Sequence, residues 1–415
     1  MQKIATHIIQ VFEHQTLRVG DLINGVCFDE AAFKAMALYQ EKQKVKYFSL
    51  VYNGVKFSHY VGIIQIGKLT LEILPKADNN DVGNPAKWQK VLIAMLSYCQ
   101  LIKIETLGIG QVQLNSNHIL DIYFSRFLNQ VHQLLVKGLP KTYLSKEENL
   151  KVLKGRLNLP MQLRKNLLHP ERFYVQYTTF SHQHLFNQVL RAALIVLSKV
   201  QLNPALKLQL QQILRGFPRL PTYTVIPRDF DQLFQIKKYQ AHRELLEISR
   251  LILLNFSPDI RSGRHHLFAL LFDMNKLFEE YIFRRLKLLE NDTLKVQRQT
   301  AKPFWQRRMI RPDLLLQIGD KKYILDTKWK MLNNHAPSME DLKQLYIYCQ
   351  YFNAEQGVLI YPNVHQLENK KAIPFQPTEK EGHLTKGQIL FSNVLEETGV
   401  LNHKIGPDIL DAMLS

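Results

Sequence analysis

The chain has 415 residues, of which 46% are hydrophobic and 22% are charged, a composition typical of soluble globular proteins. This length exceeds a single domain of roughly 100 to 200 residues, so two or three domains with sizeable cores are expected. There is no uncharged run of about 18 residues that could span a bilayer. The N-terminus also lacks the apolar segment and small-residue cleavage site of a secretory signal, so the sequence predicts a cytoplasmic protein without a membrane partner.

The charge balance favours a polyanionic partner. Fifty-four Lys and Arg against 36 Asp and Glu give a net charge of +18, and a surplus of this size commonly accompanies nucleic-acid binding. The alternative is a soluble protein that is merely basic, because net charge governs association and not fold.

Cysteine and histidine usage excludes two common kinds of site. Cys27, Cys99 and Cys349 lie far apart without CxxC pairing, which argues against a disulfide framework and a cysteine zinc site. The 15 histidines include neither an HExxH motif nor a Cys/His ligand set, so zinc is disfavoured.

Residues 1–85 are predicted to form a β-rich domain. The segment 47–76 alternates apolar and polar residues around the turn signals Asn53-Gly54 and Gly67-Lys68, which is the pattern of antiparallel hairpins in a small barrel or sandwich. The Asn-, Asp-, Gly- and Pro-rich stretch 77–87 predicts the first domain boundary.

Residues 86–258 are predicted to be mainly helical. Helical periodicity occurs at 87–100, 118–139 and 185–201. A basic and irregular stretch, 141–173, separates the second helix from the third. Its Lys and Arg side chains could meet phosphates or an acidic partner, or could form a solvated charged face.

Residues 259–415 show the order of an α/β domain. A helix is expected at 265–290, followed by strands at 294–300, 305–310, 313–318 and 322–328, a helix at 341–352 and a buried strand at 357–362. This order defines the third predicted domain, and the whole chain is therefore predicted to be a multi-domain α+β protein.

Two carboxylates and a lysine in this domain suggest chemistry. Side chains two apart in a strand share a face, so Asp326 and Lys328 project together. If 313–318 pairs with 322–328 as a hairpin, Asp313 approaches Asp326. Converging carboxylates are ligands for Mg²⁺, and a lysine beside them can orient water or stabilise a developing anion, as phosphodiester hydrolysis requires. The alternative is a surface hairpin with an ion pair worth under about 1 kcal/mol.

Two flanking helices could add to this site. Glu279 and Glu280 lie in an apolar helical frame, so one of the two could reach the metal edge. Gln344 and Tyr348 form an i, i+4 pair on the later helix, and could hold the lysine-bearing strand or reach DNA.

In this order the residues resemble the PD-(D/E)xK nuclease superfamily: Glu279, Pro312-Asp313, Asp326-Thr327-Lys328 and Gln344 with Tyr348. The resemblance implies a restriction-endonuclease-like core in the third domain. It also implies that Asp313, Asp326 and the Thr327 carbonyl bind Mg²⁺, for which Mn²⁺ can substitute, with Glu279 assisting and Lys328 acting on the water.

Further segments resemble the McrC family of nuclease subunits from McrBC-type and LlaJI-type restriction systems. They lie in all three predicted domains, at 60–76, 153–166, 186–194, 274–282 and 341–362. The resemblance implies a Mg²⁺-dependent DNA endonuclease subunit of a two-component, NTP-dependent restriction complex that acts on modified DNA. The implied partners are DNA and a hexameric McrB-like AAA+ GTPase, with self-association through the nuclease domain.

The chain itself is not predicted to bind a nucleotide. Gly67-Lys68-Leu69-Thr70 has the end of a phosphate-binding loop without its glycine spacing, and Gly108 with Gly110 is only a fragment of a dinucleotide fingerprint. The energy would come from the partner, which residues 1–85 could bind, although an independent DNA-binding barrel is an alternative for them. Two other functions remain open: a regulatory subunit with an idle nuclease site, and a free-standing RecB-like repair nuclease.

Overall fold

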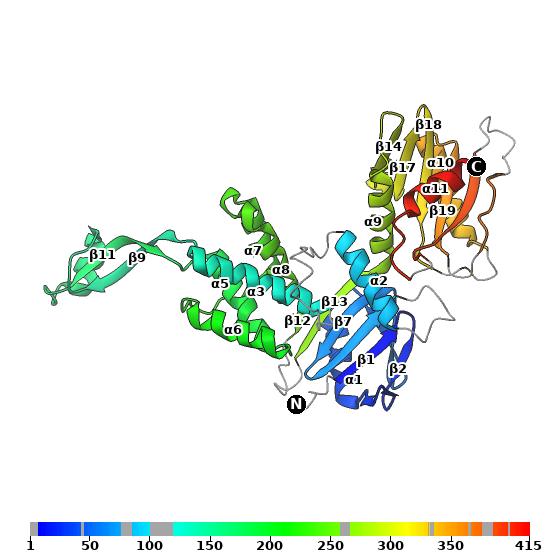
Figure 1. Ribbon diagram of the computed structural model, residues 1–415. Helices are drawn as coiled ribbons and strands as arrows, with labels where there is room; N and C mark the ends of the chain where they lie inside the picture. Colours follow the sequence, from blue (N-terminus) through cyan, green and yellow to red (C-terminus); the bar gives the residue numbers. More distant parts are fainter. Residues whose placement is uncertain are drawn as a thin grey trace. The chain divides into compact units, whose positions relative to one another are not determined.

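The computed structural model (Figure 1) describes residues 7–42, 45–75, 85–99, 119–257, 266–330, 332, 336–363, 367–375, 385–396 and 399–415. The chain divides into two compact units. The first comprises Met1–Ile64, Leu69–Gln113 and Leu271–Ser415, and the second Gln65–Lys68 and Leu114–Leu270. The boundary predicted at 258/259 and most of the one predicted at 77–87 fall outside the described residues, as does Gly108-Ile-Gly110.

The N-terminal part of the first unit is a set of small sheets with two helices. Its elements are β1 (His7–Phe12), β2 (Thr16–Arg18), β3 (Leu22–Ile23), β4 (Val26–Cys27), α1 (Glu30–Lys42), β5 (Phe48–Val51), β6 (Gly54–Phe57), β7 (Tyr60–Ile66), β8 (Leu69–Leu74) and α2 (Pro85–Tyr98). The predicted hairpins are confirmed: β5 pairs with β6 in antiparallel register, and β7 and β8 are neighbours joined at Gly67-Lys68.

Two features of this part were not predicted. The outer strand β1 runs parallel to β8, so the sheet is not built from antiparallel hairpins alone, and α1 lies between β4 and β5. Parallel strands require a crossover, which the long path from β1 through α1 to β8 provides. Local alternation cannot reveal such non-local pairing.

The second unit consists of a helical bundle and a projecting β structure. Its elements are α3 (Ile119–Lys137), β9 (Thr142–Leu150), β10 (Arg156–Leu157), α4 (Leu159–Asn166), β11 (Phe173–Ser181), α5 (Leu185–Leu197), α6 (Pro204–Gly216), α7 (Pro227–Gln235), η1 (Lys237–His242), α8 (Arg243–Leu254) and β12 (Phe256–Ser257). Figure 1 shows β9 and β11 extending away from the bundle helices.

The stretch 141–173 was predicted to be irregular, and this prediction is wrong. The strands are ordered β10-β11-β9, and β9 and β11 pair along nine residues each. Asn158 caps α4 by accepting a hydrogen bond from the Met161 N–H. The strand is hard to recognise from the sequence because one face of β9 is only half-buried and the other is exposed, so apolar residues do not alternate regularly with polar ones. We call residues 142–181 the β9–β11 arm.

The C-terminal part of the first unit contains a six-stranded mixed sheet ordered β14-β17-β18-β19-β21-β20. Strand β13 (Leu267–Asp273) leads from the second unit into this part. The elements that follow are α9 (Met274–Lys287), β14 (Leu294–Arg298), β15 (Lys302–Trp305), β16 (Arg308–Ile310), β17 (Leu314–Ile318), β18 (Lys321–Thr327), α10 (Met339–Phe352), β19 (Gln356–Pro362), β20 (Ile373–Pro374), β21 (Lys386–Ser392) and α11 (Ile405–Leu414). The predicted order of helix, strands, helix and strand is confirmed, but the single strand expected at 305–310 is wrong, because this segment contains the turn between β15 and β16.

One predicted helix is too long at its start. Residues 267–273 form strand β13, and α9 begins only at Met274, where the Asp273 carboxylate accepts hydrogen bonds from the Asn275 and Lys276 N–H groups. The run LFALLF satisfies a buried strand as well as a helix, and periodicity alone cannot separate the two.

A buried hydrogen bond joins the N-terminal and C-terminal parts of the first unit. The Trp329 indole N–H donates to Glu13 Oε1 at 2.7 Å, and the Trp329 ring packs against Phe278 with centroids 5.2 Å apart. Both Glu13 and Trp329 are buried. Among the described helices, none has the length and apolarity needed to cross a membrane.

Candidate active site

The hairpin β17–β18 brings the two predicted aspartates together. Leu314 pairs with Leu325, so Asp313 lies one position before β17, across from Asp326. The Asp313 Oδ2 atom accepts hydrogen bonds from the Thr327 N–H at 2.8 Å and from its hydroxyl at 2.9 Å. These bonds fix one oxygen of Asp313 against the end of β18, as the hairpin interpretation predicted.

Asp326 and Lys328 form a close ion pair on the same side of the strand. Asp326 is only 2% exposed, and Lys328 Nζ lies 2.7 Å from its Oδ2. No regular hydrogen bond to this buried oxygen is present in the described part of the chain, and the ion pair with Lys328 offsets its charge. Burial and the nearby Asp313 raise the pKa of Asp326 to about 6, against the opposing effect of Lys328.

Lys328 is held in its charged form. Burial alone would lower its pKa, but the neighbouring carboxylates, Asp326 foremost, more than offset this effect, and the pKa of Lys328 is raised. Its Nζ also donates to Gln344 Oε1 at 3.1 Å, and the Gln344 amide donates to the Tyr348 hydroxyl at 2.7 Å. The predicted Gln344–Tyr348 pair on α10 therefore positions the lysine.

The two glutamates of α9 have different surroundings. Glu280 accepts a hydrogen bond from Arg284 at 2.5 Å and pairs with Arg298. Glu279 instead accepts from the Gln299 amide at 3.0 Å. Burial, together with Asp313, raises the pKa of Glu279, so Glu279 is the glutamate that lies in the field of the aspartates.

Gln299 is a site residue that sequence reasoning missed. Besides its bond to Glu279, its backbone N–H donates to the Asp313 carbonyl at 2.9 Å. Its φ of 49° lies in the left-handed region, which residues other than glycine rarely adopt. Gln299 thus connects the helix glutamate to the hairpin aspartate. Nothing in the sequence marks it, because glutamine is not a residue that favours this backbone conformation.

Asp341 is the second residue that was missed. It is buried in the first turn of α10, where its Oδ2 atom accepts hydrogen bonds from Lys330 at 2.6 Å, Ser338 at 2.7 Å and Tyr361 at 3.4 Å. Its Oδ1 atom lies 3.9 Å from Lys328 Nζ. A signal was present, because Ser338-x-x-Asp341 is a helix N-terminal capping pattern.

The residues present suit a hard divalent cation. Among the described residues, no three His, Cys, Asp or Glu side chains are grouped to hold a metal ion. The candidate ligands are the carboxylates of Asp313 and Asp326 with the Thr327 carbonyl, and Glu279 is an acidic neighbour whose pKa is raised by burial and by both aspartates. A buried carboxylate oxygen without a regular hydrogen bond, whose ionisation a second carboxylate opposes, is an environment that a cation relieves.

A family model described as the McrBC 5-methylcytosine restriction system component matches residues 55–362. No curated protein matches the sequence.

Solved structures resemble the fold at low sequence identity. One is the refined half-complex from the tetradecameric assembly of Thermococcus gammatolerans McrB AAA+ hexamers with bound McrC. A chain of that structure is 18% identical over 98% of this chain and 99% of its own length, with a TM-score of 0.66. Another is the cryo-EM structure of the Thermococcus gammatolerans McrBC complex, with 18% identity over 67% of this chain and 86% of that one and a TM-score of 0.49.

The family match covers well over half of the sequence and includes every residue of the candidate site. The chain belongs to the McrBC 5-methylcytosine restriction system component family.

Proposed function

We propose that the chain is the Mg²⁺-dependent DNA endonuclease subunit of an NTP-dependent, modification-dependent restriction complex. The observation that carries this proposal is the grouping of Asp313, Asp326 and Lys328 at the end of one hairpin, with the lysine held by Gln344. Asp313, Asp326 and the Thr327 carbonyl would hold the metal ion, for which Mn²⁺ could substitute. When bound, the ion would activate water and neutralise phosphoryl charge.

The chain's own residues have separate roles in this proposal. The Lys328 ammonium, fixed by Gln344 and the Asp326 carboxylate, would orient the attacking water and stabilise the charge that builds on the phosphoryl oxygens. Asp341, in the first turn of α10, would hold this helix against the segment that follows β18, because its carboxylate binds Lys330 and lies close to Lys328. Glu279, kept in place by Gln299, would face the metal edge.

The partner would be an McrB-like AAA+ GTPase hexamer, since one of the similar solved structures contains McrB AAA+ hexamers with bound McrC. Supercoiled plasmid, methylated and unmethylated, should be cut by the chain only together with its AAA+ partner, Mg²⁺ and GTP or ATP. Cutting by the chain alone at DNA ends would favour the RecB-like alternative. Stimulation of the partner's NTPase without any cutting would favour the regulatory subunit.

The β9–β11 arm offers a surface for that partner. Leu159, Leu163 and Leu167 follow one another at helical i, i+4 spacing on and after α4, and they are 62%, 65% and 74% exposed. Grouped exposed leucines mark protein contacts. Sequence analysis assigned the partner contact to residues 1–85, and that assignment stays a prediction; the leucine row makes the arm the stronger candidate.

Replacing Leu159, Leu163 and Leu167 together by glutamine should weaken association with the AAA+ partner at least about 10-fold, because exposed apolar anchors lose their burial in the complex. Folding should be unaffected, since none of the three is in the core. Val136→Gln, at a residue of α3 that is 75% exposed, is the matched control. Co-purification with the AAA+ partner measures the result. If the triple variant is recovered with the partner as well as the wild type is, another surface of the chain makes the contact.

A further inference from the structure

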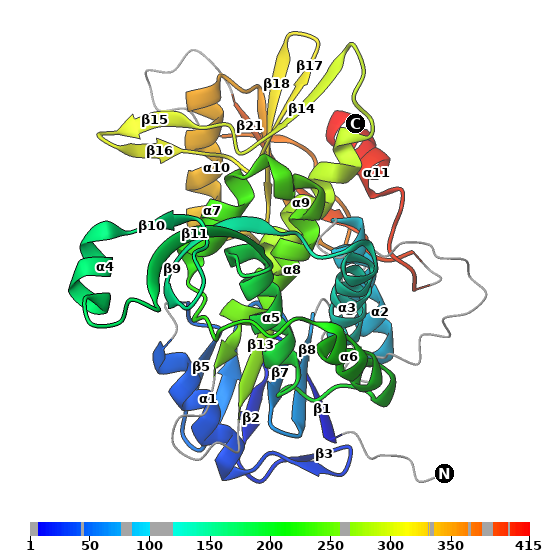
Figure 2. The ribbon, with the colours of Figure 1, turned by 90° about the vertical axis from the view of Figure 1, so that its left-hand side faces the viewer.

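The β15–β16 hairpin is an exposed element between Gln299 and Asp313. All residues from Ala301 to Met309 are exposed, and the hairpin returns to the core only at Ile310. Figure 2 shows the hairpin extending beside α10. Its residues contribute little to the apolar core, so the position of the hairpin depends on how its base is attached.

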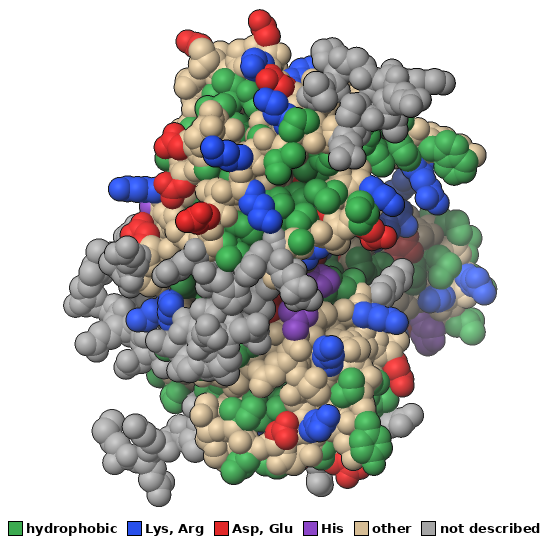
Figure 3. All heavy atoms as spheres, turned by 90° about the vertical axis from the view of Figure 1, so that its right-hand side faces the viewer, with side chains coloured by type: hydrophobic (Ala, Val, Ile, Leu, Met, Phe, Trp, Pro, Cys, Tyr) green, Lys and Arg blue, Asp and Glu red, His purple; other side chains and the backbone are tan. Residues whose placement is uncertain are grey.

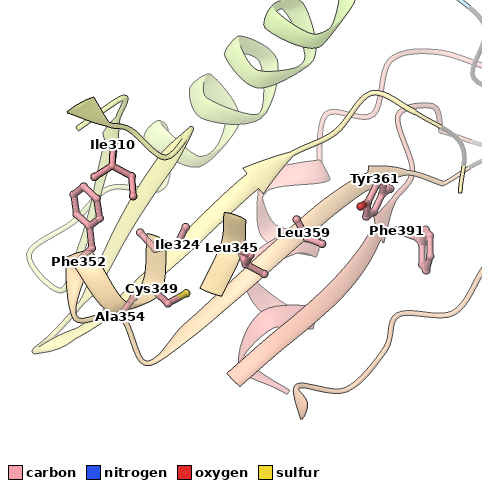
Figure 4. Close-up of a cluster of buried hydrophobic side chains, with 9 residues drawn as sticks. All are labelled: Ile310, Ile324, Leu345, Cys349, Phe352, Ala354, Leu359, Tyr361 and Phe391. Atoms are coloured by element: carbon pink, nitrogen blue, oxygen red, sulfur yellow. The ribbon is translucent and has the colours of Figure 1, made fainter. Parts of the chain in front are cut away.

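The base of the hairpin is firmly attached to α10. Ile310 lies in the buried cluster with Phe352 and Ile324 (Figure 4). The Lys302 ammonium donates to the Tyr351 carbonyl at 2.8 Å, and the Phe304 and Tyr351 rings lie 5.2 Å apart. The hairpin is therefore held by the helix that also holds Lys328 through Gln344.

The tip of the hairpin presents a tryptophan to solvent. Trp305 is 59% exposed, whereas Trp88 and Trp329 are each 4% exposed. A register shift between Pro303 and Trp305 and a left-handed Gln306, with φ 50°, shape the turn. Among the described residues the one ring contact of Trp305 is with Arg308, 6.0 Å from its centroid, so most of the indole face is open.

The hairpin is also purely basic. Between Thr300 and Pro312 the sequence contains Lys302, Arg307, Arg308 and Arg311 and no acidic residue. The three arginines are exposed and form no ion pair with any described residue. On the face of the molecule drawn in Figure 3, lysines and arginines are interspersed with acidic and apolar side chains.

The hairpin lies within reach of the candidate active site. Trp305 pairs with Arg308 across the hairpin, and Asp313 lies five positions after Arg308 in the sequence, a path of at most about 18 Å. The Gln299 N–H bond to the Asp313 carbonyl closes the base of this loop. A ligand on the tip would therefore lie roughly five nucleotides or fewer along a strand from the carboxylates.

We propose that the β15–β16 hairpin binds the DNA strand beside the cleaved phosphodiester, with Arg307 and Arg308 on phosphates and the Trp305 indole stacked on a base that has left the duplex stack. This inference rests on the proposed function. Aromatic side chains stack on unpaired bases of any identity, and arginine pairs with phosphate through its planar fork. An apolar protein partner would not need three unpaired arginines around the tryptophan.

The test is DNA binding in EDTA, which separates binding from cleavage, by the full-length chain alone and in complex with its AAA+ partner. The probes are fluorescein-labelled oligonucleotides: a single strand, a paired duplex and a duplex with an unpaired base. Trp305→Ala should weaken binding to the single strand and the unpaired base about 10-fold, and Trp305→Phe should restore most of it. The exposed Tyr52, at 90%, provides the control Tyr52→Ala, which should bind like the wild type.

Two further readouts complete the test. Because Trp88 and Trp329 are buried, the single strand should quench the exposed part of the tryptophan emission in the wild type and not in Trp305→Ala. Replacing Arg307 and Arg308 by glutamine should reduce the salt dependence of binding.

The outcomes separate the two proposals. Absence of DNA binding by the wild type, alone and in complex, would overturn the proposed function and the hairpin inference with it. Wild-type binding that Trp305→Ala leaves unchanged would overturn the hairpin inference alone. Loss of the AAA+ partner from Trp305→Ala with unchanged DNA affinity would identify the hairpin as a protein contact and also overturn it.

Discussion

Replacing Lys328 by alanine should slow DNA cleavage by the assembled complex about 10²–10³-fold, which is the usual cost of losing one preorganised group that stabilises transition-state charge. The ammonium lies 2.7 Å from Asp326 and 3.1 Å from Gln344, so it is fixed in place before any substrate arrives. The loss should affect the rate of cutting and not DNA affinity, because the lysine is recessed and only 21% exposed. Single-turnover cleavage of plasmid with saturating partner, nucleotide and Mg²⁺ measures it.

Two variants control for this substitution. Lys321→Ala removes an exposed lysine of the same strand, β18, whose partner is Glu355, and should cut at the wild-type rate. Gln344→Ala keeps the ammonium but frees it from α10, so an intermediate loss of about 10-fold is expected. A Lys328→Ala protein that cuts normally would mean that the hairpin site is not the nuclease, and NTPase stimulation by that protein would then support the regulatory alternative.

The elements of the C-terminal region could be predicted from sequence because local pattern decides them. Strands β17, β18 and β19 are short apolar runs between clear turns, and α10 begins at a serine cap. The parallel pairing of β1 with β8 could not be predicted, because it joins strands that are distant in sequence. The strand β13 was mistaken for helix because it is apolar on both faces and runs directly into α9.

The site could be predicted to the extent that spacing implies geometry. A two-residue interval in a strand places Asp326 and Lys328 together, and hairpin pairing adds Asp313; the structure shows the Asp326–Lys328 ion pair and the hairpin register that sets Asp313 opposite Asp326. The choice between Glu279 and Glu280 could not be made, because it depends on which of them meets Arg284 and Arg298. Gln299 could not be predicted, because its role depends on a left-handed backbone conformation and a glutamine side chain does not indicate such a conformation.

Asp326→Asn should abolish cleavage and yet stabilise the protein without metal at neutral pH. Burial and Asp313 raise the pKa of Asp326 to about 6, above the usual value of about 3.9 for an unfolded chain. The folded state therefore binds this proton more tightly than the unfolded state does. Stability falls as the pH rises from about 4 to about 6, and above that range the ionised carboxylate destabilises the fold by on the order of 2–3 kcal/mol.

Asparagine removes this cost, although Lys328 loses its ion-pair partner, so a net gain of about 1–2 kcal/mol is expected above about pH 7 and little change near pH 4. Thermal unfolding in EDTA across this pH range measures it. Addition of Mg²⁺ at about pH 8 should raise the melting temperature of the wild type, because the ion binds the folded state alone, and should not raise that of the variant. If the variant is instead less stable than the wild type at every pH, Asp326 is a structural ion-pair partner of Lys328, and the metal ligands must be sought among other residues.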